Sequence, residues 1–142
     1  MSDFSAFLAQ NKIKRENVKF VASKNFVGEG GKPIAWEIRP IDCEEDEALR
    51  KSCTRQIKVP GRPGAYRSEI DSNAYVGKLA ARCTVYPNLN DKELQDSYKV
   101  MGDDSLLKKM LSPGEYADYC NKVSEINGFE QDINELVDEA KN

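Results

Sequence analysis

The sequence has 142 residues, of which 39% are hydrophobic and 32% are charged, and its formal net charge is −3. This length is typical of one domain that buries a core without the help of disulfides. No apolar run approaches the ~18 residues that span a membrane, and the N-terminus lacks the basic start and apolar core of a secretory signal. We therefore expect one soluble, intracellular domain over residues 1–142.

The composition also restricts the chemistry. The chain contains no histidine, which excludes a histidine general base and the Ser–His and Cys–His dyads. A glycine-rich segment at 28–31 lacks the Lys-Ser/Thr ending and the following helix of a phosphate-binding loop. We predict a non-enzymatic protein with no catalytic residue, metal or cofactor. Four isolated cysteines without a CxxC pair predict buried or half-buried thiols rather than a zinc site or disulfides: Cys43, Cys53, Cys83 and Cys120.

Residues 1–17 have weak amphipathic character, with Phe4, Phe7 and Leu8 spaced for one face of a short helix. This helix either packs on its own domain, which we favour, or forms an arm that binds a partner. Residues 18–26 and 34–41 alternate apolar and polar side chains, and the glycines between them predict an antiparallel β-hairpin.

A helix is predicted to begin after Asp42, with Asp42 as N-cap and Glu45 as its capping-box partner. The segment 54–69 is basic and interrupted by Gly and Pro, which predicts a second hairpin. Basic residues near Tyr66 fit either nucleic acid or an acidic protein surface. The pI of about 5.1 and the lack of a nucleic-acid motif favour the acidic surface. The basic residues are Arg50, Lys51, Arg55, Lys58, Arg62 and Arg67.

Residues 70–142 predict a series of helices. The first, 73–85, follows an N-cap at Asp71 or Ser72 and should be the most buried, since its small residues allow close packing. The next begins at Asn90, carries Met101 on its inner face and ends at Gly102. A third follows Asp103 or Asp104.

The last two helices have clear limits. One begins at Ser112, with Pro113 at its first position and Glu115 closing a capping box, and Gly128 ends it. The other is amphipathic and covers residues 129–140. The predicted fold class is α+β, with N-terminal antiparallel hairpins (18–69) packed on a mainly helical C-terminal half (70–142).

Charge is distributed unevenly along the chain. Residues 1–85 carry 15 Lys/Arg and 11 Asp/Glu, a net charge of +4, and residues 86–142 carry 6 and 13, a net charge of −7. Such asymmetry is typical of two faces with different partners, or of a homo-oligomer that pairs unlike ends. Acidic helix surfaces without a partner role would give the same pattern.

Four segments, in this order along the chain, resemble the XkdN-like family of phage tail assembly chaperones. Lys99 departs from the family pattern, in which glycine occupies this position, and this bears on where the helix from Asn90 ends. The segments are Trp36–Ile41 (WEIRPI), Tyr86–Tyr98 (YPNLNDKELQDSY), Met110–Tyr116 (MLSPGEY) and Glu125–Phe129 (EINGF).

The resemblance implies a chaperone of a phage or prophage that acts in the host bacterial cytoplasm and is absent from the mature virion. Such proteins are thought to bind the helical tape-measure protein and to assist assembly of the tail tube around it. The family has no assigned catalytic residues. In many tailed phages a translational frameshift also yields a longer form.

A chaperone for helices needs an apolar groove with a polar rim. We predict that eight apolar residues of the C-terminal half line or cover that groove, although each also fits the core of the domain. Two other interpretations remain open: a structural tail or connector component retained in the particle, and a nucleic-acid binder that uses the basic stretch 50–67. The eight residues are Leu106, Leu107, Met110, Leu111, Tyr116, Ile133, Leu136 and Val137.

Overall fold

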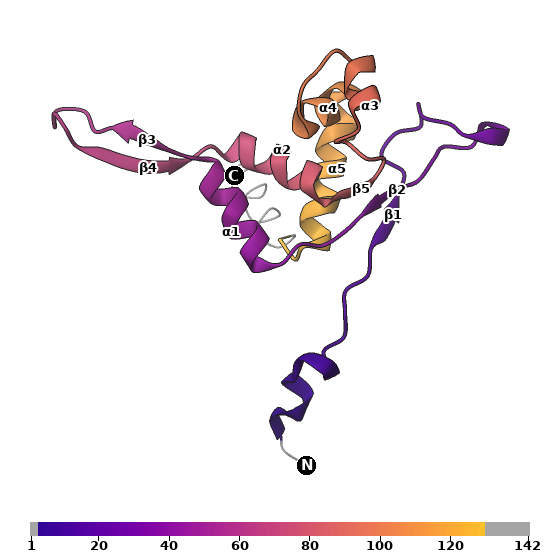
Figure 1. The fold of residues 1–142 in the computed structure, drawn as a ribbon, viewed down its shortest axis with the longest axis horizontal. Coiled ribbons are helices and arrows are strands. Elements are labelled where there is room, and N and C mark those ends of the chain that lie inside the picture. The colour runs from indigo at the N-terminus through magenta and orange to yellow at the C-terminus, as the bar shows by residue number, and fades with distance from the viewer. Residues whose placement is uncertain (1–2, 130–142) are drawn as a thin grey trace, which may run out of the picture.

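The computed structural model describes residues 3–129 (Figure 1), so the predicted helix over 129–140, including Ile133, Leu136 and Val137, lies outside the described residues. A central body contains a small sheet and five α-helices, and three extensions project from it in different directions. The fold is α+β with its helices mainly in the C-terminal half, as the sequence predicts. None of the described helices is long and apolar enough to cross a membrane.

The sheet of the body has three antiparallel strands in the order β1 (Val18–Phe20), β2 (Trp36–Ile38) and β5 (Thr84–Tyr86). Val18 pairs with Ile38, and Phe20 pairs with Trp36, which confirms the first hairpin. A short 3₁₀ turn, η3 (Glu29–Gly31), lies between β1 and β2.

Strand β5 was not predicted, because the expected helix ran on to Val85. The helix α2 (Ser72–Cys83) ends two residues earlier, and the extended backbone of Thr84 starts the strand that pairs with β2. The β-branched residues Thr84 and Val85, followed by Pro87, favour this extended conformation.

The core lies between the sheet and the helices. Trp36 and Ile38 point into it from β2, with 2% and 0% of their surface exposed. The Trp36 and Tyr119 rings meet edge to face with centroids 5.3 Å apart, a favoured aromatic arrangement. Burial raises the pKa of the Tyr119 phenol, and its hydroxyl lies 2.6 Å from the Thr84 hydroxyl. The hydroxyls of Thr84 in β5 and of Tyr119 in α5 (Pro113–Ile126) are thereby paired.

Helix α2 is the centre of the helical layer, and it buries six residues, more than any other described helix. Asp71 caps it by accepting a hydrogen bond from the Ala74 amide. Gly77 lets α5 approach closely: a Cβ at this position would lie 3.0 Å from the Tyr116 hydroxyl oxygen. The prediction that small residues make this the most buried helix is confirmed.

Helix α1 (Cys43–Ser52) begins as predicted, because the Asp42 carboxylate accepts a hydrogen bond from the Glu45 amide at 2.9 Å. The predicted return bond of a capping box is wrong. The Glu45 carboxylate instead accepts two hydrogen bonds from the Arg39 guanidinium, at 3.2 and 2.9 Å. Such a bidentate pair of opposite charges is stronger than a hydrogen bond from a backbone amide. This pair lowers the pKa of Glu45.

The α1–α2 contact is polar. The Tyr75 hydroxyl of α2 donates to the carboxylate of Asp46 in α1, and Arg50 pairs with the same carboxylate at 2.9 Å. The Arg50 guanidinium also lies 4.5 Å from the centre of the Tyr75 ring. Burial, and then the hydrogen bond to Asp46, raise the pKa of Tyr75.

Helix α3 (Lys92–Ser97) is capped by Asp91, whose carboxylate accepts from the Leu94 amide, and not by Asn90 as predicted. Met101 is 91% exposed, so its predicted inward position is wrong. The helix ends before it, and the chain turns at Tyr98 and Lys99. Gly102, with φ of 99°, stands before α4 (Asp103–Met110) as its N-cap.

The start of α5 confirms the predicted capping box. The Ser112 hydroxyl accepts from the Glu115 amide, and the Glu115 carboxylate accepts from the Ser112 amide at 2.9 Å. Gly128 follows the helix with φ of 83°, as expected of a residue that stops a helix.

One extension is the segment between β1 and β2, and the other two are the hairpin of β3 (Thr54–Lys58) and β4 (Tyr66–Ile70) and the N-terminal segment. The hairpin strands pair only with each other among the described residues, and most of their side chains are exposed. The N-terminal segment contains two 3₁₀ helices, η1 (Asp3–Phe7) and η2 (Ala9–Asn11), and points away from the body. The expectation that this segment packs on its own domain is wrong.

Three of the four cysteines are buried, as predicted, and Cys43 is exposed. Cys43 occupies the first position of α1, whose one buried residue is Leu49. Burial raises the pKa of the Cys83 and Cys120 thiols.

Candidate partner-binding surface

An apolar pocket opens where the end of the sheet meets α3 and α4, and its volume is about 110 Å³. Its lining consists of apolar and aromatic side chains from six separate stretches of the chain. A pocket with this lining holds one apolar side chain of a ligand rather than a charged group. The lining residues are Phe26, Ile34, Trp36, Tyr86, Pro87, Leu94 and Met110.

The segment between β1 and β2 forms one wall of this apolar pocket. The Ile34 amide donates to the Phe26 carbonyl at 2.9 Å, which holds the two residues side by side. The Phe26 and Trp36 rings lie 6.3 Å apart at 45°. Trp36 is itself fixed by Tyr119 behind it, so the inner surface of the pocket is set by the core.

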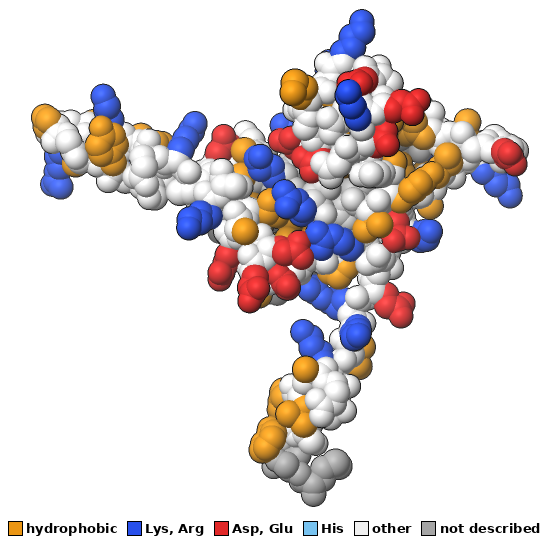
Figure 2. All heavy atoms as spheres, viewed as in Figure 1, with side chains coloured by type: hydrophobic (Ala, Val, Ile, Leu, Met, Phe, Trp, Pro, Cys, Tyr) orange, Lys and Arg blue, Asp and Glu red, His pale blue; other side chains and the backbone are white. Residues whose placement is uncertain are grey.

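The opposite wall comes from β5 and the helices. Tyr86, 55% exposed, ends β5 and the half-buried Pro87 follows it, while Leu94 and Met110 contribute from α3 and α4. Hydrophobic side chains lie along the segment between β1 and β2 beside β5, and acidic side chains lie over α3 next to them (Figure 2). The pocket is therefore bordered on one side by negative charge.

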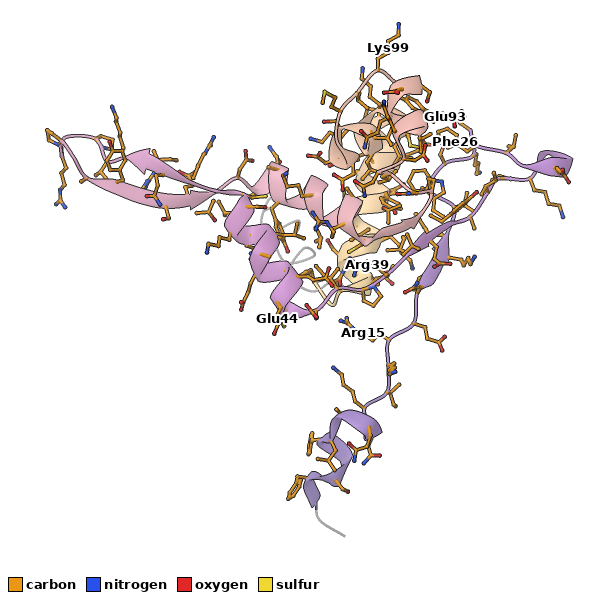
Figure 3. All side chains as sticks on the ribbon, viewed as in Figure 1. Arg15, Phe26, Arg39, Glu44, Glu93 and Lys99 are labelled. Atoms are coloured by element: carbon orange, nitrogen blue, oxygen red, sulfur yellow. The ribbon has the colours of Figure 1, made fainter. Side chains whose placement is uncertain are left out.

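That acidic border is the rim of a second, shallower hollow that shares Leu94 with the apolar pocket. Asp91 and Glu93 line it, and both are exposed. Figure 3 labels Phe26, which lines the apolar pocket, and Glu93, which lines the second hollow. A ligand that places an apolar side chain in the pocket can place a Lys or Arg on this rim, because Leu94 lines both hollows.

The five predicted groove residues that the structure describes differ in how exposed they are. Leu106 and Leu107 are 0% exposed and Leu111 is 5% exposed, so in this structure they hold α4 against α2 and α5 and face no solvent. Tyr116 is half-buried against Gly77, and burial raises the pKa of its phenol. Met110 alone of these five residues lines the apolar pocket.

Sequence reasoning did not find the other six pocket residues. The alternation of Ile34 and Trp36 predicted an apolar face, and it did not indicate what covers that face. Nothing local in the sequence indicates that Ile34 and Trp36 meet Pro87 and Leu94, because these two groups are separated by 50 or more residues. The position of β5 beside β2 is the fact that brings them together.

The basic stretch forms the projecting hairpin and its base. Lys and Arg side chains follow the hairpin on both sides (Figure 2), and Tyr66 is 57% exposed. Arg67 pairs with Glu69 at 3.7 Å, and both side chains are largely exposed. The hairpin thus presents positive charge on an extension with no aromatic platform beyond Tyr66.

Comparison with known proteins agrees with the resemblance noted in the sequence. Residues 4–141 match the sequence profile described as phage XkdN-like tail assembly chaperone protein. The chain is 37% identical over 141 residues to the phage-like element PBSX protein XkdN of Bacillus subtilis (strain 168), covering 99% of this chain and 94% of that protein.

A second relative from the same organism, the uncharacterized protein YqbN, is also 37% identical over 141 residues, which cover 99% of this chain and 93% of that protein. A crystal structure of the protein YqbN superposes with a TM-score of 0.76 at 32% identity, covering 91% of this chain and 98% of that chain.

Proposed function

The chain belongs to the phage XkdN-like tail assembly chaperone family, and from this premise we propose that its apolar pocket binds amphipathic helices of the tape-measure protein. The observation that carries the proposal is an open, apolar pocket of about 110 Å³ with an acidic rim beside it. A tape-measure chain exposes long helices before the tube encloses it, and an apolar anchor followed by a basic residue fits this surface.

The size of the pocket suits a chaperone that must release its client. Burial of one Leu or Phe side chain contributes about 1.5–3 kcal/mol, so a single pocket holds a helix weakly. A weak, repeated contact keeps a long helical chain soluble and still lets tube subunits displace the chaperone. The family belongs to a non-catalytic kind of protein, which agrees with binding as the main activity.

Fluorescence of Trp36 tests the proposal directly. Trp36 is the single tryptophan of the chain and forms part of the pocket, so insertion of a ligand side chain should change its emission. Peptides that cover the tape-measure protein encoded with this chain would be titrated into the full-length protein. Peptides with a Leu or Phe followed by a Lys or Arg one helical turn later should bind best.

Two methionine substitutions form a matched pair for this assay. Met110 lines the pocket, whereas Met101 is 91% exposed and lies outside it. We expect Met110→Glu to weaken peptide binding at least about tenfold, since it puts a charge into an apolar site. Met101→Glu should leave binding unchanged. Equal affinities of two folded variants would exclude the pocket as the binding site.

The same proposal places the protein in the host bacterial cytoplasm during assembly and outside the finished particle. Mass spectrometry of purified particles would separate this role from that of a structural tail or connector component. We expect tail-tube and tape-measure peptides to be present and peptides of this chain to be absent. Detection of the chain in amounts comparable with other tail proteins would favour the structural role.

A further inference from the structure

The N-terminal arm (residues 3–17) exposes more apolar surface than a free segment normally does. Phe4 is 65% exposed, Phe7 is 85% exposed and Ile13 is 90% exposed, and Leu8 is exposed as well. Single exposed apolar residues are common, but a cluster of them on one projecting segment marks an interaction site. The arm also keeps a defined shape, because the Asn11 side chain donates to the Ser5 carbonyl at 2.7 Å.

The root of the arm is fixed to the body. Arg15 donates to the Ile126 carbonyl and to the Ile41 carbonyl, each at 3.2 Å. The Asn17 side chain donates to Glu37 at 3.0 Å. These contacts join the arm to β2, to the segment that follows β2 and to the end of α5, so its direction is determined by the fold.

That direction carries the arm away from the pocket of its own chain. The arm enters the sheet at Val18, which pairs with Ile38, whereas the pocket lies at the Trp36 end of the same strand pair. Figure 1 shows the arm leaving one side of the body while the segment between β1 and β2 leaves another. To reach its own pocket, the arm would have to reverse its course and break the Arg15 contacts.

We propose that the N-terminal arm occupies the apolar pocket of a second copy of this chain, with Phe7 as the inserted side chain. The chemistry of the two surfaces is complementary. The pocket of about 110 Å³ is lined by apolar side chains and accepts one apolar side chain of a partner. Phe7 is the most exposed aromatic residue of the arm.

Charge supports the same pairing. Exposed Lys12 and Lys14 follow Phe7 in the arm, and exposed Asp91 and Glu93 form the rim beside the pocket. Opposite charges at the edge of an apolar contact speed association and select the orientation. The basic end of the arm thus meets the acidic rim when Phe7 enters the pocket.

This contact joins unlike surfaces, so a pair of chains keeps one arm and one pocket free. Further copies can add at both ends. Since the arm uses the pocket assigned above to the tape-measure helix, self-association and client binding compete. This last consequence rests on the proposed function, whereas the contact between arm and pocket does not.

Sedimentation velocity on mixed variants of the full chain tests the proposal. One variant, Phe4→Asp with Phe7→Asp, disables the arm and keeps the pocket, and Met110→Glu disables the pocket and keeps the arm. The wild-type chain should associate weakly as its concentration rises, with a dissociation constant of about 1 mM. Each variant alone should associate at least about tenfold more weakly. An equal mixture should form a dimer and nothing larger, because it contains one intact arm–pocket pair.

Each other outcome overturns the proposal. A wild-type chain that stays monomeric, an arm variant that associates normally, or a mixture that fails to dimerise would each contradict it. Met101→Glu serves as the control and should associate like the wild type. The peptide titration with Trp36 separates the two proposals: an arm variant that binds peptides yet associates normally refutes the arm contact alone, and a pocket variant that binds peptides normally refutes the client site.

Discussion

Lys99 adopts the left-handed backbone conformation, with φ of 57°, and is the single non-glycine residue with positive φ in the described part of the chain. It occupies the position after the C-cap of α3. The Lys99 amide donates to the Asp96 carbonyl at 3.0 Å, and the Val100 amide donates to the Gln95 carbonyl at 3.2 Å. These two bonds are the Schellman motif, whose left-handed residue is usually glycine.

We predict that Lys99→Gly stabilises the protein. A side chain in the left-handed region costs roughly 1–2 kcal/mol, and glycine removes this cost. Glycine also gives the unfolded chain more freedom, which offsets about 0.5–1 kcal/mol of the gain. The Lys99 side chain points into solvent (Figure 3), so no packing is lost. The free energy of unfolding should therefore rise by about 0.5–1 kcal/mol.

Urea unfolding followed by Trp36 fluorescence measures this change. The midpoint should increase with an unchanged slope, and the thermal midpoint should rise by roughly 2–4 °C. Lys99→Ala is the matched control, because it removes the same charge and keeps the strained backbone. If Lys99→Gly is no more stable than Lys99→Ala, the reasoning from backbone strain is refuted.

Three further predictions address packing, charge and the hairpin. Gly77→Ala should lower the free energy of unfolding by about 1 kcal/mol in urea, because the overpacking cost against Tyr116 exceeds the gain in helix propensity. Tyr116→Phe removes the hydroxyl oxygen that the new methyl group would meet, so the cost of Gly77→Ala should be smaller in that background. Glu45→Gln should lower stability at pH 7 by up to about 1 kcal/mol. Because Arg39 holds the pKa of Glu45 below its ordinary value of 4.5, the wild type loses this stabilisation as the pH falls through that lowered pKa, and the unfolding midpoints should converge in acid. Replacing residues 55–69 by a short glycine linker should change the free energy of unfolding by less than about 1 kcal/mol in a thermal scan, since most of these side chains are exposed. Fluorescence anisotropy at low salt should detect no DNA binding by the intact chain, and binding that disappears with the hairpin would contradict this.

The elements that the sequence predicted correctly depend on neighbours along the chain. The Ser112 capping box and the Asp71 cap each need only a side chain and an amide three residues away. The first hairpin depends on alternation and on the glycines between its strands. Such signals act within a few residues, so a single sequence contains them completely.

The errors arose where a partner outside the local pattern decides the structure, or where a backbone turn ends a helix early. Thr84 and Val85 continue the helical pattern of α2, but pairing with β2 draws them into a strand. Glu45 has the right spacing for a capping box, but Arg39 offers a stronger bond. Lys99 ends α3 early, so Met101 never reaches the inner face on which a continued helix would have placed it.

The pocket could not be predicted for a similar reason. An apolar stripe on a helix shows that one face is covered, and it does not show whether the cover is the same chain or a partner. Leu106 and Leu107 are consistent with cover by the same chain and with cover by a partner, and in the structure they are buried under α2 and α5. Met110 lies at the edge of the same stripe, where the cover ends and the pocket begins.

Weak pockets and self-association fit together energetically. One buried side chain contributes about 1.5–3 kcal/mol, which by itself gives affinity no better than millimolar. Chains joined from arm to pocket leave free pockets only at ends or where a client displaces an arm. A long helix that enters one pocket then meets neighbouring pockets at high local concentration. Each further arm that it displaces increases its overall affinity for the assembled chains. A client helix with many spaced apolar side chains can therefore displace the arms from the pockets, whereas a short helix with one such side chain cannot.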